Sequence, residues 1–475
     1  MEPAFTGKTL GEWKQMGFLR ANRDINRLET PEGQITLLGL FLPLLIETLL
    51  RNLMGTVSVV ILSQYSDNAV AAVGAATQLL NMVQIFYTLV ATGVAIIINQ
   101  NLGAGNRRYS GEVATVALVL CAGLSILTGA AMSIFALPLM GMMQLTGEVL
   151  VLAADYFRIV TALAITQALI TLFSFIVRCY GRTQIAMVVA LVMNVINALL
   201  CLLVVYRPFE TPLQGVAGIG WARIISEAVA LGIMIIAIRR VKVGFTLRAL
   251  RPLPVKMIRQ IFAVSIPPGV ANLSYGVSQV VSTAIIATLG MAAVSAKVYL
   301  SNIFFYVYLL GMCLGQVTTI MIGRMVGAGE YQKAERLNRQ NIVIGIACNV
   351  VLSVLVVAFY RPVLGMFTSS EEIIAMCLPV MFADILVEIG RAFNNIEGGC
   401  LNGAGDMVFS MAISVPSCWL ISILFSYILG VVCGLGLVGC WIAFAMDELA
   451  RGMAQMMRWR SRKWMSKSLI RRADG

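Results

Sequence analysis

The sequence contains no histidine, and only 12% of its 475 residues are charged. Without histidine there is no imidazole to bind a metal or to exchange protons near neutral pH, so any proton that the protein handles must sit on a carboxylate. A soluble globular protein carries about 25% charged residues, and this chain has too few to cover a water-facing surface. These two shortages exclude histidine-based chemistry and argue against a soluble fold.

Paired cysteines and a cleavable signal peptide are also missing. The ten cysteines lie mostly inside apolar runs and none forms a C-x-x-C pair, so we interpret them as packing residues and not as a disulfide or zinc framework. Residues 1–37 carry both charge signs and lack a short apolar core before a cleavage site. An interfacial amphipathic helix over 10–28 and a solvated leader explain that segment equally well.

Long apolar runs are what the chain does have, since 59% of its residues are hydrophobic. An apolar run of about 20 residues is long enough to cross a bilayer as a helix. Twelve such runs occur, at 38–63, 69–98, 112–136, 150–176, 184–206, 216–238, 262–289, 292–322, 340–360, 373–401, 408–432 and 436–457. The sequence therefore predicts an all-α membrane protein with twelve transmembrane helices.

The formal net charge of +12 is distributed unevenly between the predicted loops. With the N-terminus in the cytoplasm, 27 of the 35 Lys and Arg residues fall in cytoplasmic segments, Arg178 and Arg324 among them, and two, Arg207 and Arg361, fall in outer loops. Such a bias is the orientation signal of a membrane protein. We therefore predict that both termini are cytoplasmic and that the basic charge needs no nucleic-acid partner to explain it.

A repeated Gly-Ala-Gly, at 103–105 and at 327–329, sets the organisation of the chain. The difference in numbering between the two copies is 327 − 103 = 224, and we call this difference the repeat offset. The same offset relates Pro43 to Pro267 and Gly181 to Gly405. We interpret each Gly-Ala-Gly as a turn that ends a helix, because glycine adopts the left-handed cap conformation without strain. A phosphate-binding loop would need Gly-x-x-x-x-Gly-Lys after a strand.

The repeat offset predicts one six-helix unit present twice. Because six is even, both units share an orientation and are related by a pseudo-twofold axis along the membrane normal. The predicted domains are a cytoplasmic leader at 1–37, an N-lobe at 38–238, a basic cytoplasmic linker at 239–261, a C-lobe at 262–457 and a basic cytoplasmic tail at 458–475.

Charged residues inside the predicted spans are costly and need a partner or a purpose. Asp384, Glu388 and Arg391 lie on one face of the tenth span, and two carboxylates with one guanidinium make a site suited to a proton or Na⁺. Glu47, four residues before Arg51, is a further ion-coupling candidate. A structural ion-pair cluster explains the tenth-span stripe equally well. Other in-span charges are interpreted as structural pairs: Arg223 with Glu227, and Asp447 and Glu448 with Arg451.

Seven further residues are candidates to line a substrate cleft between the lobes: Asn81, Gln84, Tyr87, Asn194, Asn197, Tyr275 and Lys297. The amides could instead bond between helices, and the aromatic rings could simply pack. Lys297 could extend to the lipid headgroups or orient a charged substrate, and the sequence does not separate the two.

Several motifs, in order, carry a family resemblance. They are Leu-Pro-Leu-Leu-Ile-Glu at 42–47, Asp67-Asn-Ala-Val, Gln-Asn-Leu-Gly-Ala-Gly-Asn at 100–106, Asn194-x-x-Asn197, Gly-Arg-Met-Val-Gly-Ala-Gly-Glu at 323–330 and Leu-Asn-Gly-Ala-Gly-Asp at 401–406. Together, over about 35–457, they resemble the multidrug and toxic compound extrusion (MATE) family. The resemblance implies two six-helix lobes around a central cleft, with alternating access driven by inward movement of Na⁺ or protons.

The chain departs from the family pattern at three places. Where many relatives have Val-Asp-Thr in the first span, this chain has Val57-Ser58-Val59, and Tyr275 stands where some sodium-coupled relatives have an acid. Arg391 stands near the position of the tenth-span acid. The identity of the coupling ion therefore cannot be taken from the resemblance.

The resemblance to this family implies a secondary active exporter of organic, drug-like or cationic compounds, antiporting Na⁺ or H⁺, and this is our prediction. The alternatives are an exporter of one endogenous metabolite and a flippase for a lipid-linked precursor. We expect no catalytic residues, no metal site and no cofactor beyond the coupling ion. The expected partners are small organic substrates and the lipid bilayer, and we expect no nucleic-acid partner. We expect the protein to be a monomer in a bacterial inner membrane.

Overall fold

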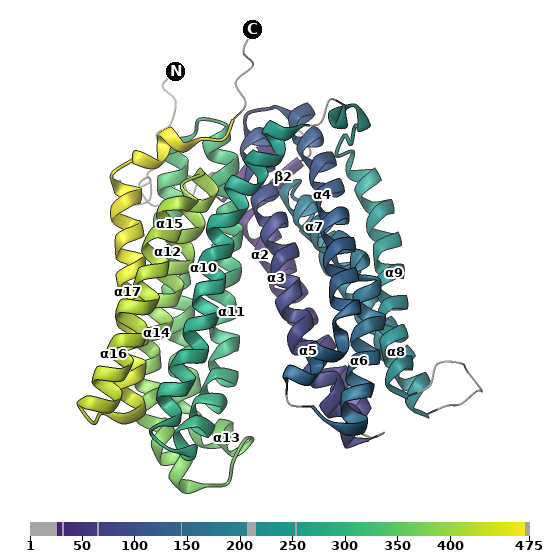
Figure 1. Ribbon diagram of the computed structural model, residues 1–475. Coiled ribbons are helices and arrows are strands. Elements are labelled where there is room, and N and C mark those ends of the chain that lie inside the picture. Colours follow the sequence, from purple (N-terminus) through teal and green to yellow (C-terminus); the bar gives the residue numbers. More distant parts are fainter. Residues whose placement is uncertain are drawn as a thin grey trace, which may run out of the picture.

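The computed structural model describes residues 26–30, 33–63, 66–143, 145–206, 215–251 and 254–470. Its long helices run side by side in two lobes, which diverge toward the end that carries the short helices α5 (Ala136–Met142) and α13 (Tyr360–Gly365) (Figure 1). At the opposite end the lobes meet at the two Gly-Ala-Gly turns. We call this end the glycine end.

The helices correspond closely to the predicted spans. The N-lobe contains α2 (Leu37–Ser63), α3 (Asp67–Gly103), α4 (Arg107–Ile134), α6 (Gly147–Ala162), α7 (Ala164–Cys179), α8 (Thr183–Tyr206) and α9 (Gly215–Val241). The C-lobe contains α10 (Val255–Ala287), α11 (Met291–Gly327), α12 (Tyr331–Ala358), α14 (Glu371–Ala404), α15 (Met407–Ser417), α16 (Leu424–Tyr427) and α17 (Gly436–Arg460). The π-helical segment η2 (Cys418–Ile423) joins α15 to α16, and a second one, η3 (Ile428–Val432), follows α16. Together these elements form one span, Met407–Val432.

Twelve spans follow from these elements. Among the described residues, ten helices are long and apolar enough to cross a membrane, and α6 and α7 form one further span bent by 52°. The twelfth is α17, which carries the charged residues Asp447, Glu448 and Arg451. The prediction of an all-α membrane protein of two six-helix lobes is confirmed, apart from a small β-hairpin before α2.

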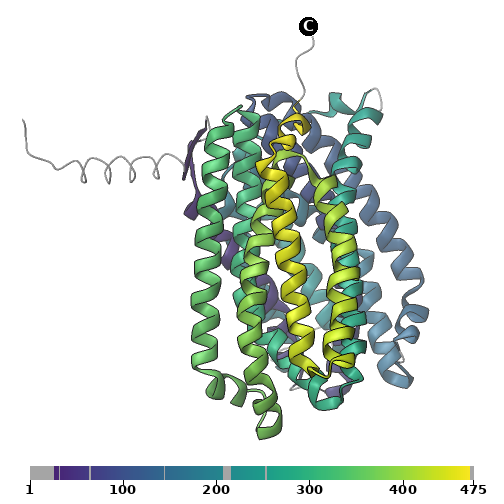
Figure 2. The same ribbon diagram turned by 90° about the vertical axis from the view of Figure 1, so that its left-hand side faces the viewer.

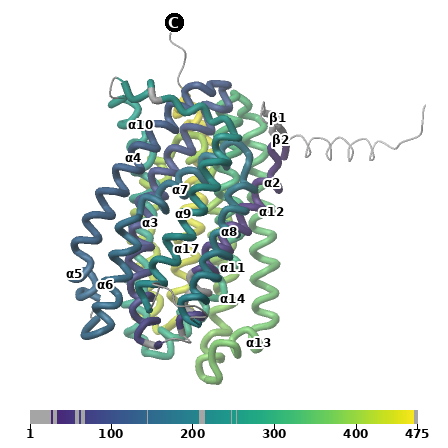
Figure 3. Tube along the Cα trace, turned by 90° about the vertical axis from the view of Figure 1, so that its right-hand side faces the viewer, coloured from purple at the N-terminus to yellow at the C-terminus, as the bar shows by residue number. Residues whose placement is uncertain are grey.

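The segments outside the spans differ from their predicted form. The hairpin pairs β1 (Arg27–Thr30) with β2 (Gly33–Thr36) near the glycine end (Figure 3), so the helix predicted over 10–28 cannot include Arg27 and Leu28. Residues 1–25 of that segment lie outside the described residues. The predicted linker 239–261 is shorter in the structure, because α9 continues to Val241 and α10 begins at Val255. The described residues between them contain the short helix η1 (Leu247–Leu250).

Each lobe buries the beginning of its first helix in the other lobe. Leu37 and Leu40 of α2 belong to the apolar core of the C-lobe, while Ile261 and Val264 of α10 belong to the core of the N-lobe. The repeat offset relates Leu37 to Ile261 and Leu40 to Val264, so the exchange is reciprocal. Reciprocal contact between equivalent positions is what a twofold axis produces.

The Gly-Ala-Gly turns lie at the same axis. Gly105 and Gly329 have φ of 77° and 75°, the left-handed conformation expected of a helix-ending glycine. Gly103 and Gly327 are the last residues of α3 and α11, and a Cβ on either would collide with the backbone of the other helix. The absent side chains therefore let the two helices touch.

Two symmetric hydrogen bonds close the glycine end. Gln100 Nε2 donates to Gly403 O at 2.8 Å, and Arg324 Nη2 donates to Cys179 O at 2.5 Å. The repeat offset relates Gln100 to Arg324 and Cys179 to Gly403, so the two bonds are equivalent. Arg324 is thus a buried contact between lobes, and its assignment to a cytoplasmic loop was wrong.

The chain after α17 covers this contact. Trp464, in η4 (Lys463–Lys467), is fully buried and stacks on Trp459 with ring centroids 4.2 Å apart. Leu469 N then donates to Gln100 Oε1 at 2.6 Å. The described C-terminal segment of the C-lobe is therefore tied to the N-lobe at the same residue that makes one of the symmetric bonds.

Candidate functional site

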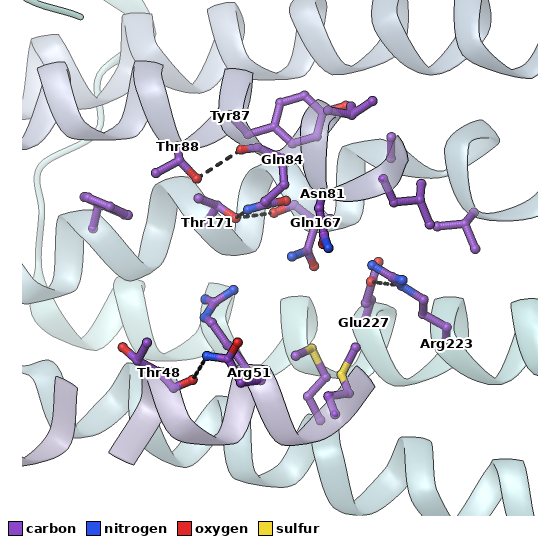
Figure 4. Close-up of a pocket in the computed structure, with 18 of the residues that line it drawn as sticks. Thr48, Arg51, Asn81, Gln84, Tyr87, Thr88, Gln167, Thr171, Arg223 and Glu227 are labelled. Carbon is purple, nitrogen blue, oxygen red and sulfur yellow. Dashed lines mark hydrogen bonds and ion pairs between the residues drawn. The ribbon is translucent and has the colours of Figure 1, made fainter. Parts of the chain in front are cut away.

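Two adjoining polar cavities lie between the helices. The first, about 350 Å³, is enclosed mainly by α2, α3, α7 and α9, and we call it the N-lobe cavity (Figure 4). The second, about 440 Å³, lies between α3 and α7 of the N-lobe and α10, α11, α14, α15 and α17 of the C-lobe, and we call it the central cavity. They share the lining residues Thr88, Phe175, Arg178 and Gln316.

A buried carboxylate lies next to the N-lobe cavity and is bonded to two guanidinium groups that line it. Glu47 of α2 is fully buried and accepts from Arg178 Nη2 at 2.7 Å and Arg51 Nη2 at 3.1 Å. Arg178 lies near the end of α7 and lines both cavities, so the prediction that it belongs to a loop was wrong. With all three groups ionised, this cluster has a net charge of +1.

A second pair lies farther along the same cavity. Arg223 Nε donates to Glu227 Oε1 at 3.0 Å, and Thr166 Oγ1 donates to Glu227 Oε2 at 2.9 Å. Thr166 occupies the first turn of α7, directly after the 52° bend at Leu163. The bend thus places a hydroxyl donor against a carboxylate of α9.

Three of the predicted cleft residues line the N-lobe cavity. Asn81, Gln84 and Tyr87 of α3 border it, and Figure 4 shows the two amides beside Gln167, across the cavity from Glu227. Gln84 Nε2 donates to Thr171 Oγ1 at 2.9 Å, so this amide also joins α3 to α7. Gln84 thus combines a place on the cavity wall with the interhelical bonding that was the alternative interpretation.

The C-lobe contributes a cluster of opposite charge to the central cavity. Arg451 Nη2 lies 2.7 Å from Asp447 Oδ2 and 2.8 Å from Glu448 Oε1, which gives two carboxylates for one guanidinium. Asn394 Nδ2 donates to the other oxygen of Glu448 at 2.8 Å. Tyr275, a predicted cleft residue, lines the cavity with its ring 5.6 Å from the Arg451 guanidinium carbon. This cluster has a net charge of −1 when ionised.

The predicted stripe Asp384, Glu388 and Arg391 lies on α14 as expected, but its members contact different helices. Asp384 Oδ1 accepts from Trp441 Nε1 of α17 at 2.6 Å, and Asp384 Oδ2 is buried without a hydrogen-bond partner. Glu388 accepts from Arg391 at 2.6 Å and from Asn349 of α12 at 3.0 Å. None of the three belongs to the lining of either cavity.

Three predicted cleft residues are also absent from the lining of both cavities. Asn194 bonds back to Ala190 O of its own helix at 2.7 Å, and Asn197 is buried beside Cys201. Lys297 Nζ donates to Thr283 Oγ1 at 2.7 Å, between α11 and α10. The side chain of Ser58, at the family's usual aspartate position, lies outside the described part of the chain.

The sequence interpretation missed the role of the last span of each lobe. Glu227 and Asp447 occupy equivalent positions in the two lobes, because 447 − 227 equals 441 − 221, the difference that relates Trp221 to Trp441. The sequence favoured an interpretation of both as structural pairs related by the repeat, whereas Glu227 lines one cavity, and Asp447 holds Arg451, which lines the other. The repeat register relates the two positions, but it carries no sign of which of them faces a cavity.

Two equivalent six-helix membrane lobes, with a polar cavity between them and a charge cluster in each, have the architecture of a membrane transporter built from an internal repeat. The model of the MatE family matches this chain twice, over residues 43–203 and 267–428. The starts of the two matches, 43 and 267, are separated by the repeat offset found from the glycines. The chain therefore belongs to the MatE family, whose members are transporters and not enzymes.

Individual relatives match nearly the whole chain. The uncharacterized transporter YisQ of Bacillus subtilis (strain 168) is 34% identical over 435 residues, covering 91% of this chain and 96% of its own. The probable multidrug resistance protein NorM of Thermotoga maritima is 25% identical over 451 residues, covering 94% and 96%. A crystal structure of MATE in the bent conformation has a TM-score of 0.83 at 20% identity, covering 91% and 96%. The last likeness concerns the fold alone.

Proposed function

We propose that the protein exports organic cations in exchange for H⁺ or Na⁺, by alternating access between its two lobes. The observation that carries this proposal is the net negative cluster of Asp447, Glu448 and Arg451 at a cavity between the lobes. A binding site at the interface of the repeats can be opened to either side when the lobes rock. The names of NorM relatives as multidrug resistance proteins support the same substrate class.

The central cavity suits a small organic cation in size and chemistry. Ligand cavities of about 300–1,000 Å³ hold drug-sized molecules, and this one has about 440 Å³. Glu448 supplies a carboxylate, and the rings of Tyr275 and Tyr308 supply faces that attract cations. Asn394 and Gln455 add amides that can orient polar groups of the substrate.

Coupling is assigned to carboxylates of the C-lobe. Asp384 is buried, receives only an indole hydrogen bond and leaves Oδ2 without a partner, so a proton or Na⁺ would satisfy it. Glu388 shares α14 with it and is the second coupling candidate, next to Arg391. Glu47 is less suited, because two guanidinium groups already neutralise it. An ion arriving at these acids would change the relative free energies of the two lobe arrangements.

In the cell, we place the protein as a monomer in the bacterial plasma membrane with both termini in the cytoplasm. The bias of Lys and Arg supports this orientation, even after the buried Arg178 and Arg324 are removed from the loop count. The glycine end then faces the cytoplasm. Its two symmetric bonds would hold the cytoplasmic side closed, while the divergent end faces outward.

The test is transport by the purified protein in liposomes under imposed Na⁺ or pH gradients, with ethidium as the organic cation. We expect one of the two gradients to drive ethidium transport. The ion dependence of transport is then measured in Asp384→Asn, Glu388→Gln and Glu47→Gln, and it should change in the variants whose carboxylate binds the coupling ion. The coupling assignment is wrong if all three variants keep the ion dependence of the wild type. The exporter proposal fails if neither gradient moves any organic cation.

A second candidate follows from the N-lobe cavity, whose lining includes Arg51, Arg178 and Arg223. Three guanidinium groups favour an anionic substrate, as expected of an endogenous anionic metabolite or a lipid-linked precursor. An anionic dye driven by the same gradients, with ethidium left unmoved, would favour this candidate over the first.

A further inference from the structure

A third cavity, of about 330 Å³, lies on the outer flank of the C-lobe and does not adjoin the other two. It is formed near the glycine end by α12, α14 and α17, and Figure 2 shows α14 between the other two helices. Its lining comprises Glu335, Asn338, Arg339, Ile342, Glu397, Met456, Trp459, Arg460 and Arg462. Neither the motifs nor the proposed export function uses any of these residues.

The inner wall of this cavity carries a carboxylate that forms no ion pair within the described residues. Glu397 is fully buried, and both of its oxygens accept only from Asn338 Nδ2, at 3.3 Å each. Among the described residues it forms no ion pair, and Arg460 at the mouth acts on its charge only from beyond ion-pair distance. Asn338 Oδ1 is also buried and has no hydrogen-bond partner. Three acceptor oxygens therefore meet at this wall without a cationic donor, an arrangement that is costly unless a ligand supplies one.

The mouth of the same cavity is cationic. Arg462 is held by Glu335, with Nε and Oε1 2.8 Å apart, whereas Arg339 and Arg460 are exposed and form no ion pair within the described residues. Acceptors inside and guanidinium groups outside match a short zwitterion that enters with its ammonium first. Its phosphate would then remain beside the arginines, which bind phosphate through paired N–H donors.

The surroundings identify the source of such a zwitterion as a lipid. Val343 of α12 and Met453 and Met457 of α17 are exposed apolar side chains within one turn of lining residues. In a membrane span such side chains contact acyl chains, and basic pockets between helices near the membrane surface bind lipid headgroups. We propose that this cavity binds the headgroup of phosphatidylethanolamine, with the ammonium at Glu397 and Asn338 and the phosphate at Arg339 and Arg460.

The site is placed where it can influence transport. Glu397 and Met456 line it, while the next residue on α14, Gly398, and the preceding residue on α17, Gln455, line the central cavity. The same two helices thus separate the lipid site from the central cavity. This inference does not depend on the proposed substrate or coupling ion.

Native mass spectrometry of the purified protein with defined lipids tests the proposal. We expect the wild type to retain phosphatidylethanolamine about tenfold more strongly than phosphatidylcholine, which has no N–H donor, or phosphatidylglycerol, which has no ammonium. Glu397→Gln should reduce this preference to about twofold or less. Arg339→Ala with Arg460→Ala should weaken retention of all three lipids. Glu335→Gln, a second acid of the same cavity that is already paired, is the matched control and should keep the preference.

Equal retention of the three lipids by the wild type would overturn the proposal, and so would an unchanged preference in Glu397→Gln. Equal retention of phosphatidylethanolamine and phosphatidylglycerol, lost in the arginine variant, would show a phosphate site only and would overturn the assignment of the ammonium. If Glu397→Gln does not fold, the mono-, di- and trimethylated headgroups are compared on the wild type. Retention should fall with each methyl group, and a flat series contradicts the proposal.

Discussion

In the N-lobe, one carboxylate, Glu47, is shared by two guanidinium groups, whereas in the C-lobe one guanidinium, Arg451, is shared by two carboxylates. The scaffold around them is the same, since equivalent glycines, first helices and cross-lobe bonds recur at the repeat offset. The two clusters have net charges of +1 and −1. A repeated fold can therefore carry different chemistry in each copy, because the contacts that preserve the scaffold lie at other positions than the charged clusters.

The last span of each lobe shows how such a difference arises. Glu227 and Asp447 occupy equivalent positions, but the arginine partner lies four residues before Glu227 and four residues after Asp447. A helix brings residues four apart onto one face in either direction, so both arrangements form an ion pair. In the C-lobe a second acid, Glu448, joins the pair and leaves one negative charge in excess.

The largest expected effect is on stability and has a different size in each lobe. Glu47→Gln leaves Arg51 and Arg178 without a counter-charge, and breaking a buried pair in this way costs about 3 kcal/mol. Asp384→Asn removes a buried charge that has no guanidinium bonded to it, so we expect little or no loss. Thermal unfolding of the two variants in detergent measures the difference. Equal destabilisation would show that the two carboxylates are held alike.

The next effect is on transport, and it tests the difference in net charge between the C-lobe cluster and the N-lobe cavity. Glu448→Gln neutralises the central cluster, and we expect ethidium transport to fall about tenfold, equivalent to about 1.4 kcal/mol. Glu227→Gln removes the same charge from the N-lobe cavity and should change ethidium transport by less than about threefold. Initial rates in liposomes provide the comparison. A larger loss in Glu227→Gln would place cation binding in the N-lobe instead.

A smaller effect concerns the two equivalent cross-lobe bonds. Arg324→Ala removes a charged donor and should lower the population of the closed glycine end about tenfold. Gln100→Ala removes two neutral bonds, one to Gly403 O and one from Leu469 N, and each should account for about a threefold decrease. Spin labels at the exposed positions Arg108 and Lys333, one in each lobe, report the opening as a longer distance in pulsed electron resonance. Unchanged distances in both variants would mean that packing alone holds this end closed.

The smallest effect is expected at Asn194, a predicted cleft residue that lines neither cavity in the structure. Asn194 bonds to the backbone of its own helix, so Asn194→Ala should leave transport within about twofold of the wild type. Gln84→Ala, which changes an amide on the wall of the N-lobe cavity, is the matched comparison. Uptake assays compare the transport rates of the two variants. A large loss of transport in Asn194→Ala would show that Asn194 takes part in transport after all.

The fold could be predicted because its information is local or periodic. Each span is a contiguous apolar run, so its existence follows from composition, and Gly105 and Gly329 mark helix ends through a backbone conformation that favours glycine. The bend between α6 and α7 was not predicted, since Leu163 and its neighbours contain neither proline nor glycine.

The site was predicted only in part because its partners are distant in sequence. Arg178 lies 131 residues from Glu47, and its position at the end of an apolar run is also typical of a loop residue. Asn81, Gln84, Tyr87 and Tyr275 do line cavities, whereas Lys297 does not. Helical periodicity places a polar residue on a face of its helix, but it does not say which helix packs against that face.

The contact of Gly103 with the end of α11, and of Gly327 with the end of α3, has a mechanical consequence. Each of these two helices has 37 residues and is therefore about 55 Å long, at 1.5 Å per residue. Helices whose tips meet backbone to backbone at these glycines form a pivot with two long lever arms. A tilt of about 10° at the pivot displaces the opposite tip by about 10 Å. A single methyl group on either glycine would wedge this pivot apart, because the backbone of the opposite helix already fills its space.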